Sequence, residues 1–267
     1  PTWPRCTPDS LVNTPEMGIH GIIEFGNRTL TGLVGILALA VVVLVWRMRV
    51  ERRVLFVLAL VVLGGVVAQA VVGGITVLTG LNPFIVGFHY IASVSLVAVC
   101  AAFLVRMYQL AGPRERVVPG WFAGLTHAIT AVLALTIVFG VLTTGAGPHS
   151  GDADVARSGF DAEVLEHVHA WPGYALFALT LVLVVSAWRL RLPVRRWAIA
   201  LLGVELVQIA VGLYQARNGL PELAVGTHMV LAALAAATMT VVVLRLKQPV
   251  AVASGLATER RRTSVHS

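Results

Sequence analysis

The sequence predicts an all-α membrane protein whose chain crosses the bilayer several times, and three observations lead to this prediction. Hydrophobic residues make up 57% of the 267 residues and charged residues only 12%, and the mean hydropathy is +0.85. Such values lie outside the range of water-soluble domains. Seven apolar runs are long enough to span a membrane as helices, at residues 29–46, 54–79, 84–109, 121–144, 165–188, 195–216 and 223–246. The runs are continuous rather than alternating, which indicates a polytopic helical bundle and not a β-barrel.

These runs follow one another as an internal repeat. The segment QAVVGGITVLTGLNPFIVGFH, which ends at His89, aligns without gaps with QIAVGLYQARNGLPELAVGTH, which ends at His228. A nearly equal shift along the chain aligns IEFGNR, before the first run, with LEHVHA, at the start of the fifth. The first, second and third runs therefore correspond to the fifth, sixth and seventh. Each half has an E-x-x-[N/H] helix start and, two helices later, a V-G-x-H helix start.

The fourth run, residues 121–144, has no counterpart in the first half. The repeat therefore predicts one further helix before Pro1 and an eight-helix native protein with two pseudo-symmetric four-helix halves, of which this chain holds seven helices and lacks the first. We expect residues 1–116 to form the N-terminal half, and residues 117–267 the C-terminal half with a basic cytoplasmic tail. An even number of helices per repeat gives both halves the same orientation, related by an axis along the membrane normal.

The distribution of positive charge predicts how the helices are oriented. Sixteen of the twenty Lys and Arg residues lie at one set of helix ends and in the C-terminal tail, and four lie on the opposite side: Arg5, Arg28, Arg157 and Arg217. The side with sixteen is expected to face the cytoplasm, because cytoplasmic loops carry an excess of Lys and Arg. This topology in a lipid bilayer accounts for the net charge of +7. We therefore expect no nucleic-acid partner.

Three histidines are candidate ligands of a metal-containing cofactor. His89, His169 and His228 each lie in the first turns of a helix that starts on the outer side, and so at similar depth. A histidine within a membrane span usually marks a ligand or a proton path, although a hydrogen bond to a helix carbonyl explains any single example equally well. His169 and His228 come from two helices separated by one other, which suits binding a haem from both faces. Zinc fits less well, since it prefers three or four close ligands that include Cys or carboxylate.

The remaining histidines are weaker candidates. His167 competes with His169, because the HVH motif places two imidazoles about 200° apart on one helix. The repeat favours His169, which aligns with Asn27, whereas His167 aligns with Phe25. Three others are interpreted as solvated or bonded to a neighbour: His127, His149 and His266.

The first half differs at the position that matches His169, because Asn27 stands there. Asn is a poor ligand for haem iron, so a haem bound by His89 would be five-coordinate or would use another group. His20, seven residues before Asn27 and near the same helical face, is a candidate replacement ligand; an ordinary interfacial histidine is the alternative. The asymmetry predicts one tightly held haem for electron transfer and one exchangeable porphyrin with an open face.

Glu24 shares a helix face with Asn27 and Arg28. Beside an open porphyrin face, this carboxylate could accept a proton or stabilise developing positive charge. A simple ion pair with Arg28 is the alternative interpretation.

The two cysteines are too far apart to pair with each other. Cys6 precedes the first run on the outer side, and Cys100 lies about 24 Å below that surface at 1.5 Å per helical residue. Cys100 is interpreted as a small core residue. Cys6, in an oxidising compartment, is interpreted as half of a disulfide whose partner is absent from this chain.

In combination, these motifs resemble the haem A synthase family of respiratory membranes. The resemblance covers essentially the whole chain and rests on PTWPRC, IEFGNR, QAVVGGITVLTGL with its VGFH sequel, TGAGPHSGD and the final GTH. It implies an eight-helix bundle that holds haem b in the C-terminal half. In the N-terminal half, a ring methyl of the substrate haem O would be oxidised to the formyl group of haem A, with water as the oxygen source.

The resemblance also implies roles for individual residues. His169 and His228 would bind the iron of haem b, Glu24 would be the catalytic carboxylate, and Cys6 would belong to an outer-loop cysteine pair. His89 would bind the substrate haem. The other residues of the expected substrate site are Asn27, Arg28 and His20.

The expected location is the plasma membrane of a bacterium, with the C-terminus in the cytoplasm. Expected partners are haem O, haem O synthase and the cytochrome oxidase assembly machinery, and a homo-oligomer is left open. The electron acceptor is not identified, and one or two protein ligands to the substrate haem are both considered, because many family members carry His where this chain has Asn27.

Two alternative functions are weighed against this interpretation. A quinone-linked di-haem electron carrier of the b type explains the histidines but gives Glu24 and Asn27 no role. A transporter built on a repeat would place polar or broken helices at mid-membrane, whereas the runs are continuously apolar, with the candidate chemistry at their outer ends.

Overall fold

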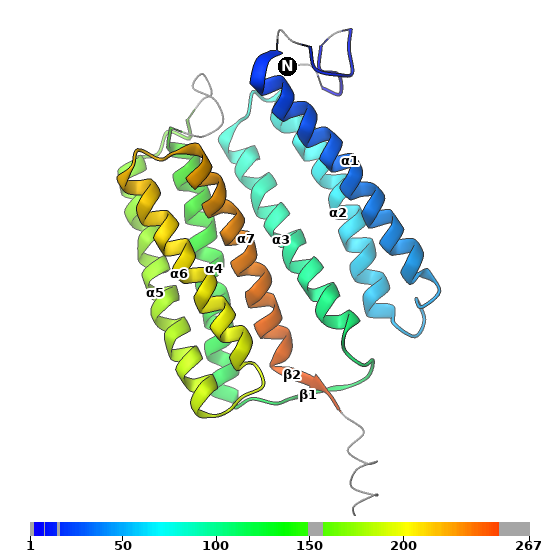
Figure 1. The fold of residues 1–267 in the computed structure, drawn as a ribbon, viewed down its shortest axis with the longest axis vertical. Coiled ribbons are helices and arrows are strands. Elements are labelled where there is room, and N and C mark those ends of the chain that lie inside the picture. Colours follow the sequence, from blue (N-terminus) through cyan, green and yellow to red (C-terminus); the bar gives the residue numbers. More distant parts are fainter. Residues whose placement is uncertain (1–2, 8, 15–16, 149–156, 251–267) are drawn as a thin grey trace, which may run out of the picture.

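The computed structural model describes residues 3–7, 9–14, 17–148 and 157–250, which fold mainly into seven long helices (Figure 1). In chain order these are α1 Gly18–Trp46, α2 Arg53–Leu78, α3 Pro83–Met107, α4 Gly120–Ala146, α5 Ala162–Arg189, α6 Arg195–Arg217 and α7 Glu222–Arg245. All seven helices found in the described residues are long and apolar enough to cross a membrane. The predicted class, a polytopic helical bundle, is therefore confirmed.

The start of α1 is the one helix boundary that the apolar runs placed wrongly. The helix begins at Gly18, eleven residues before the predicted start at residue 29, whereas the other helices begin and end within three residues of the prediction. Its first turns carry polar side chains that lower the hydropathy without breaking the helix. Glu24 and Arg28 form an i,i+4 ion pair, which supports a helix. The hydroxyl of Thr31 donates to the carbonyl of Asn27 at 2.8 Å, so this polar group is also satisfied within the helix.

The helices run antiparallel in sequence order, so their starts alternate between two ends of the molecule (Figure 1). We call the end at which α1, α3, α5 and α7 begin the histidine end, and the opposite end the basic end. Two helices at the histidine end have side-chain caps. The Asn82 side chain accepts from the backbone N–H of Phe84 at the start of α3, and that of Asp161 accepts from Glu163 at the start of α5.

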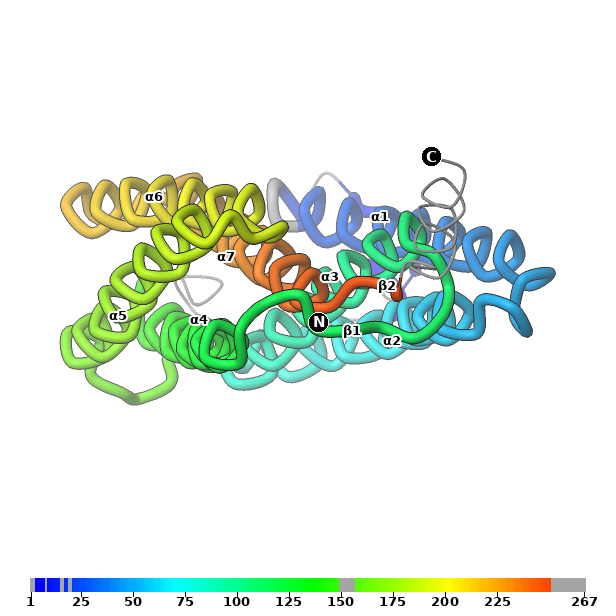
Figure 2. The backbone as a smooth tube through the Cα atoms, turned by 90° about the horizontal axis from the view of Figure 1, so that it is seen from below, coloured from blue at the N-terminus to red at the C-terminus, as the bar shows by residue number. Residues whose placement is uncertain are grey.

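Helices α4 to α7 form a four-helix bundle, and α1 to α3 extend from one side of it. Within the bundle, α4 packs on α5 and α7, and α6 packs on α5 and α7. Helix α3 packs on α7 and α4, α2 packs on α3, and α1 packs on α2. The view from the basic end shows α3 and α7 in the middle, with α1 and α2 on one side and α4 to α6 on the other (Figure 2). In the described part of the chain, α1 does not contact α3.

The main hydrophobic core fills the half of the α4–α7 bundle that is nearer the basic end. Its fully buried members come from all four helices: Phe122, Ile129, Leu183, Leu201, Met239 and Val242. A smaller cluster joins α1 and α2 around Val42, Val45 and Ala59. Because the large apolar side chains gather toward the basic end, the histidine end of the bundle is left to smaller and more polar residues.

The two loops that the repeat aligns have matching backbones. Gly80 and Leu81, after α2, have φ angles of 63° and 58°, and Gly219 and Leu220, after α6, have φ angles of 72° and 55°. In each loop the leucine N–H donates to a carbonyl near the end of the preceding helix, at 2.8 and 2.9 Å. Glycine favours this left-handed end of a helix because it has no Cβ. The repeat therefore extends to the geometry with which each loop starts the next histidine-bearing helix.

A short antiparallel sheet at the basic end was not predicted. Strand β1 (Arg114–Arg116) pairs with β2 (Lys247–Pro249), so the linker before α4 is joined to the segment after α7. Nearby, the Arg52 guanidinium donates to the carbonyls of Arg106 and Gln109 at 2.7 and 2.9 Å. Partial burial, together with the charge of Arg52, lowers the pKa of Arg114. At the basic end, arginine side chains therefore lie close together, and one of them binds two backbone carbonyls.

Candidate functional site

The three candidate histidines lie at nearly the same depth below the histidine end. His89 is the seventh residue of α3, His169 the eighth of α5 and His228 the seventh of α7. At 1.5 Å per residue, each lies about 10 Å along its helix. The predicted common layer is therefore present, but the structure brings only His169 and His228 together.

Each of these imidazoles packs against a glycine of the preceding helix. A Cβ placed on Gly140 of α4 would lie 2.8 Å from Cε1 of His169, and one on Gly212 of α6 would lie 3.1 Å from Cε1 of His228. In α2, a Cβ on Gly73 would lie 3.5 Å from Cε1 of His89. Gly73 and Gly212 occupy the same position in the two aligned segments and so are repeat mates. Because these glycines have no side chain, one edge of each imidazole ring can pack directly against the backbone of the neighbouring helix.

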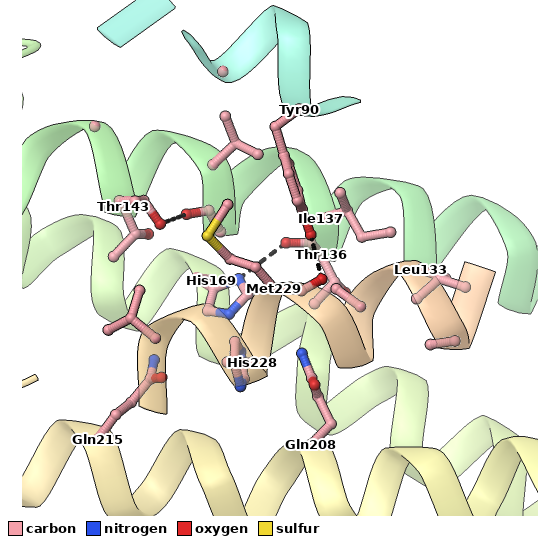
Figure 3. Close-up of a pocket in the computed structure, with 18 of the residues that line it drawn as sticks. Tyr90, Leu133, Thr136, Ile137, Thr143, His169, Gln208, Gln215, His228 and Met229 are labelled. Carbon is pink, nitrogen blue, oxygen red and sulfur yellow. Dashed lines mark hydrogen bonds between the residues drawn. The ribbon is translucent and has the colours of Figure 1, made fainter. Parts of the chain in front are cut away.

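His169 and His228 face each other across the interior of the α4–α7 bundle. Their ring centroids lie 6.2 Å apart and their planes are inclined by 75°. Figure 3 shows the two rings close together, with Gln208 and Gln215 of α6 on either side of His228. Two imidazoles that bind one metal ion from opposite sides place their centroids about 6.2 Å apart, because each metal–nitrogen bond is about 2 Å and each nitrogen lies about 1.1 Å from its ring centre. The observed ring separation is therefore compatible with one metal ion between the two rings.

Hydrogen bonding defines which nitrogen of His169 is available to a ligand. Its Nδ1 lies 2.9 Å from the carbonyl oxygen of Thr136 on α4. With Nδ1–H donating to this carbonyl, Nε2 carries the free lone pair, which is the usual arrangement for a metal-binding histidine. Nδ1 of His228 is buried and has no hydrogen-bond partner among the described residues. The contact of its Nδ1 and Cε1 edge with Gly212 leaves Nε2 for a ligand in this ring as well.

A cavity of about 250 Å³ surrounds this pair. Helices α3 to α7 all contribute to its wall, which is largely apolar, and its polar side chains include Thr136, Gln208, Gln215 and Glu205. An apolar cavity with a few polar groups is typical of small-molecule and cofactor sites. Among the described residues, no three His, Cys, Asp or Glu side chains come together as a closed metal site. The site therefore offers two nitrogens and an apolar volume, which suits a metal that brings its other ligands with it.

The structure separates His169 from its neighbour in the HVH motif. His169 lines the cavity, whereas His167 is exposed and its Nδ1 lies 2.8 Å from the carbonyl of Glu163 on the same helix. The preference for His169 over His167, which came from the repeat, agrees with this placement.

His89 lies on the other side of α3 from this cavity, in contact with α2. The Gln69 side chain donates to the carbonyl of His89 at 2.7 Å and also bonds Ser93. Nδ1 of His89 is buried without a partner among the described residues. The next residue, Tyr90, points the opposite way, because it lines the His169 and His228 cavity and donates to the carbonyl of Met229 at 2.8 Å.

The candidate residues of α1 lie together but are not joined to His89 by a contact. Glu24 is half-buried and pairs with Arg28, whose guanidinium also donates to the carbonyl of Pro4 at 2.8 Å and to the sulfur of Cys6 at 3.5 Å. Asn27 is exposed. His20 lies in the first turn of α1, and its side chain is outside the described part of the structure. In the described residues α2 separates this face of α1 from α3.

Sequence reasoning missed Glu205, and its position corrects one expectation. This carboxylate lies on α6, about halfway along the helix, and is only 4% exposed. Its Oε1 accepts a 2.8 Å hydrogen bond from the buried hydroxyl of Thr180 on α5. The expectation that polar chemistry is confined to the outer ends of the helices is therefore wrong. The signal was available, because Glu205 is the only charged residue between Arg196 and Arg217 in LLGVELVQIA and its flanks.

The comparisons with known proteins agree with the motifs. The sequence model of the COX15-CtaA family, described as cytochrome oxidase assembly protein, matches residues 11–151, which is more than half of the chain. A heme A synthase from Lysinibacillus sphaericus is 30% identical over 147 residues, which are 52% of this chain and 46% of that protein. One from Alkalihalophilus pseudofirmus is 24% identical over 160 residues, which are 60% of this chain and 52% of the relative.

A heme A synthase from Listeria monocytogenes aligns over more of both chains, with 24% identity across 86% of this chain and 77% of the relative. The chain thus spans about half the length of the first two relatives and three quarters of the third. The matches confirm the resemblance that the motifs indicated. The chain belongs to the COX15-CtaA family of cytochrome oxidase assembly proteins.

Proposed function

We propose that this protein is a haem A synthase, which oxidises a ring methyl group of haem O to a formyl group with water as the oxygen source. Three lines of support meet in this proposal: the family of the chain, the names of its relatives, and the internal cavity. The observation that carries it is the pair His169 and His228, whose rings lie 6.2 Å apart inside an apolar cavity and would hold the iron of a haem b. We propose further that it works in the plasma membrane of a bacterium, with the basic end facing the cytoplasm.

The cavity of the second half fits a haem b in its chemistry. Two imidazole rings lie 6.2 Å apart across this cavity, and the surrounding wall is largely apolar. Bound between them, haem b would supply one-electron transfer. We accordingly propose residues 117–267 as the half that holds haem b, and residues 1–116 as the half that holds the substrate.

The residues around this pair fix its geometry. The carbonyl of Thr136 orients His169 and holds its proton on Nδ1. Gly140 and Gly212 admit the two rings close to α4 and α6, and bulkier residues at these positions would push them out of line. The wall contributed by α3, with Gly87 and Tyr90, closes the cavity toward the first half.

For the substrate half we propose His89 as the ligand of the iron of haem O. The residues that we propose to complete this site lie on α1, which packs on α2: Asn27, Arg28 and His20. Gln69 fixes the backbone of His89 by donating to its carbonyl, and Gly73 gives its ring room against α2. Because Asn27 occupies the position that matches His169, the substrate would have one open face, which suits a molecule that must enter, react and leave.

Glu24 is the proposed catalytic carboxylate. Oxidation of a methyl group and one water to a formyl group releases four electrons and four protons, so the reacting carbon needs a proton acceptor beside it. The ion pair with Arg28 orients the Glu24 carboxylate, and such a positioned carboxylate can take these protons one at a time. Arg28 also bonds the carbonyl of Pro4, which ties the segment before α1 to the same site.

The proposal is tested by producing the protein in cells that also make haem O, extracting its haem and recording the pyridine haemochrome. A synthase yields the shifted spectrum of a formyl haem. A protein that returns only unmodified b-type haem after turnover with haem O would be an electron carrier, and the proposal would then be rejected.

The ligand assignment is tested separately by spectroscopy of a His228→Ala variant. This change should abolish the low-spin haem signal, because one of the two axial imidazoles is lost. His127→Ala is the matched control, since this histidine is exposed near the basic end of α4 and does not line the cavity. An unchanged low-spin spectrum in His228→Ala would refute the assignment of this ligand.

A further inference from the structure

Glu205 has a buried carboxyl group, and no step of the proposed reaction involves it. It lies about halfway along α6, where a bilayer offers neither water nor counter-ions, and it is only 4% exposed. Oε1 accepts the hydroxyl proton of Thr180, and Oε2 is buried with no partner among the described residues. An ionisable group inside a membrane span is costly and usually has a functional role.

Glu205 does not stand alone on its helix. Gln208 follows it by three residues and Gln215 by ten, with Gly212 between them, so the four positions form one stripe along α6. All three polar side chains line the cavity that contains His169 and His228. Figure 3 shows Gln208 and Gln215 reaching from α6 toward the rings. The stripe runs about 15 Å, at 1.5 Å per residue, from mid-helix to the histidine end.

The stripe also carries unused hydrogen-bonding capacity. The side-chain oxygens of Gln208 and Gln215, like Oε2 of Glu205, are buried without a partner among the described residues. Buried polar groups in proteins are nearly always satisfied, commonly by ordered water. These three atoms are therefore available to bind ordered water between Glu205 and the histidine end.

We propose that Glu205 is the proton acceptor that accompanies electron transfer through the haem held by His169 and His228. When the iron gains one electron, the Glu205 carboxylate binds one proton, so the charge of the cavity stays constant. The electron comes from the substrate methyl that is being oxidised, and the proton arrives along the α6 stripe. Re-oxidation reverses both changes, with the electron and the proton passing to an acceptor of the quinone class. This inference rests on the proposed function, because it requires a haem between the two histidines.

The surroundings of Glu205 favour this role over a fixed ion pair. The titratable groups that share its cavity are His169 from α5, His228 from α7 and Tyr90 from α3, and no Lys, Arg or Asp is among the described residues that line it. Its own bonded neighbour, Thr180, is neutral. An added electron is therefore not balanced by a fixed cation in the wall, and a proton on Glu205 is the compensating charge that this wall provides.

The test is a redox titration of the haem in the full-length purified protein at a series of pH values. With one proton taken up per electron, a tenfold change in proton concentration shifts the midpoint potential by up to about 59 mV. We expect the wild type to show such a slope over part of the range. Glu205→Gln, which keeps a hydrogen-bonding side chain but cannot titrate, should lose it, and Glu205→Asp should retain it. Glu163→Gln, which changes an exposed acidic residue of the same half, is the matched control and should behave like the wild type.

Infrared difference spectroscopy of the wild type gives a second readout that needs no variant. Reduction with dithionite should produce the C=O stretching band of a protonated carboxyl group, and oxidation should remove it. A wild-type slope that persists unchanged in Glu205→Gln overturns the inference, as does the absence of a redox-linked carboxyl band. A purified wild type that binds no low-spin haem overturns the proposed function itself, so the two failures are distinguishable.

Discussion

The contact between Gly140 and His169 gives the sharpest test of how the cavity holds its ligand. An alanine at position 140 would place Cβ 2.8 Å from Cε1 of His169, whereas carbon atoms in contact prefer about 3.5–4.0 Å. The ring would have to move by about 0.7 Å or more to relieve the overlap. That displacement is a large fraction of a metal–nitrogen bond of about 2 Å, so axial ligation should weaken.

Overpacking of this kind costs about 1–3 kcal/mol, which corresponds to a roughly 5- to 150-fold loss of haem affinity. The substitution should not destabilise α4 in the haem-free protein, because alanine is a better helix former than glycine by about 1 kcal/mol. The assay is a titration of haemin into apoprotein, followed by the low-spin absorbance, with thermal unfolding of the apoprotein measured in parallel. Gly140→Ala should lose affinity while the stability of the apoprotein is kept.

The matched control is Gly124→Ala on the same helix, where an added Cβ meets nothing within 4 Å. The contact distances also predict the order of the losses in haem affinity. The Cβ added by Gly212→Ala would lie 3.1 Å from His228, so this variant should weaken binding less than Gly140→Ala. Wild-type affinity and spectrum in Gly140→Ala would refute the view that this glycine sets the position of the ring.

Three further substitutions test other parts of the molecule. Glu24→Ala should lower the yield of haem A by about 100-fold or more while haem b content is unchanged, because a positioned acid or base contributes about that much; full activity would remove the carboxylate from the mechanism. Tyr90→Phe should destabilise the protein by about 0.5–1.5 kcal/mol, the usual value of a hydrogen bond, measured as thermal loss of the folded protein in detergent. An unchanged melting temperature would show that the bond to Met229 contributes nothing. Gln69→Leu should lower the occupancy of the substrate haem without changing haem b, since it releases the backbone of His89; parallel losses of both haems would indicate general unfolding instead.

The sequence is sufficient to predict most of the fold because the membrane imposes one dominant pattern. Apolar runs of about twenty residues identify six of the seven helices closely, and the repeat identifies the loops that start α3 and α7. The start of α1 could not be placed by the same reasoning. Its first turns contain Glu24, Asn27 and Arg28, which lower the hydropathy, while the i,i+4 ion pair and the bond from Thr31 to the Asn27 carbonyl that support the helix are not visible in a hydropathy profile.

The sequence predicts the candidate histidines of the site but not the residues that surround them. His169 was preferred over His167 by its alignment with Asn27, and this preference agrees with the placement of its ring in the cavity. The contact between His169 and Gly140 could not be foreseen, because it joins two helices whose relative rotation depends on packing. The same holds for Thr180 and Glu205, which meet only when α5 packs on α6. The pairing of β1 and β2 joins two segments that are far apart in the chain, one before α4 and one after α7. It is made by backbone hydrogen bonds, so the side-chain pattern of the sequence does not indicate it.

Helix α3 has a consequence for how such a duplicated protein can change. His89 on this helix packs against Gly73 of α2, and the next residue, Tyr90, lines the cavity of the second half and bonds its own repeat mate, Met229. The cavity is therefore not closed by α4 to α7 alone, because α3 completes its wall. A substitution that changes how α3 packs on α2 therefore also changes the wall of the cavity on its other side. The two halves of the chain are coupled through this one helix.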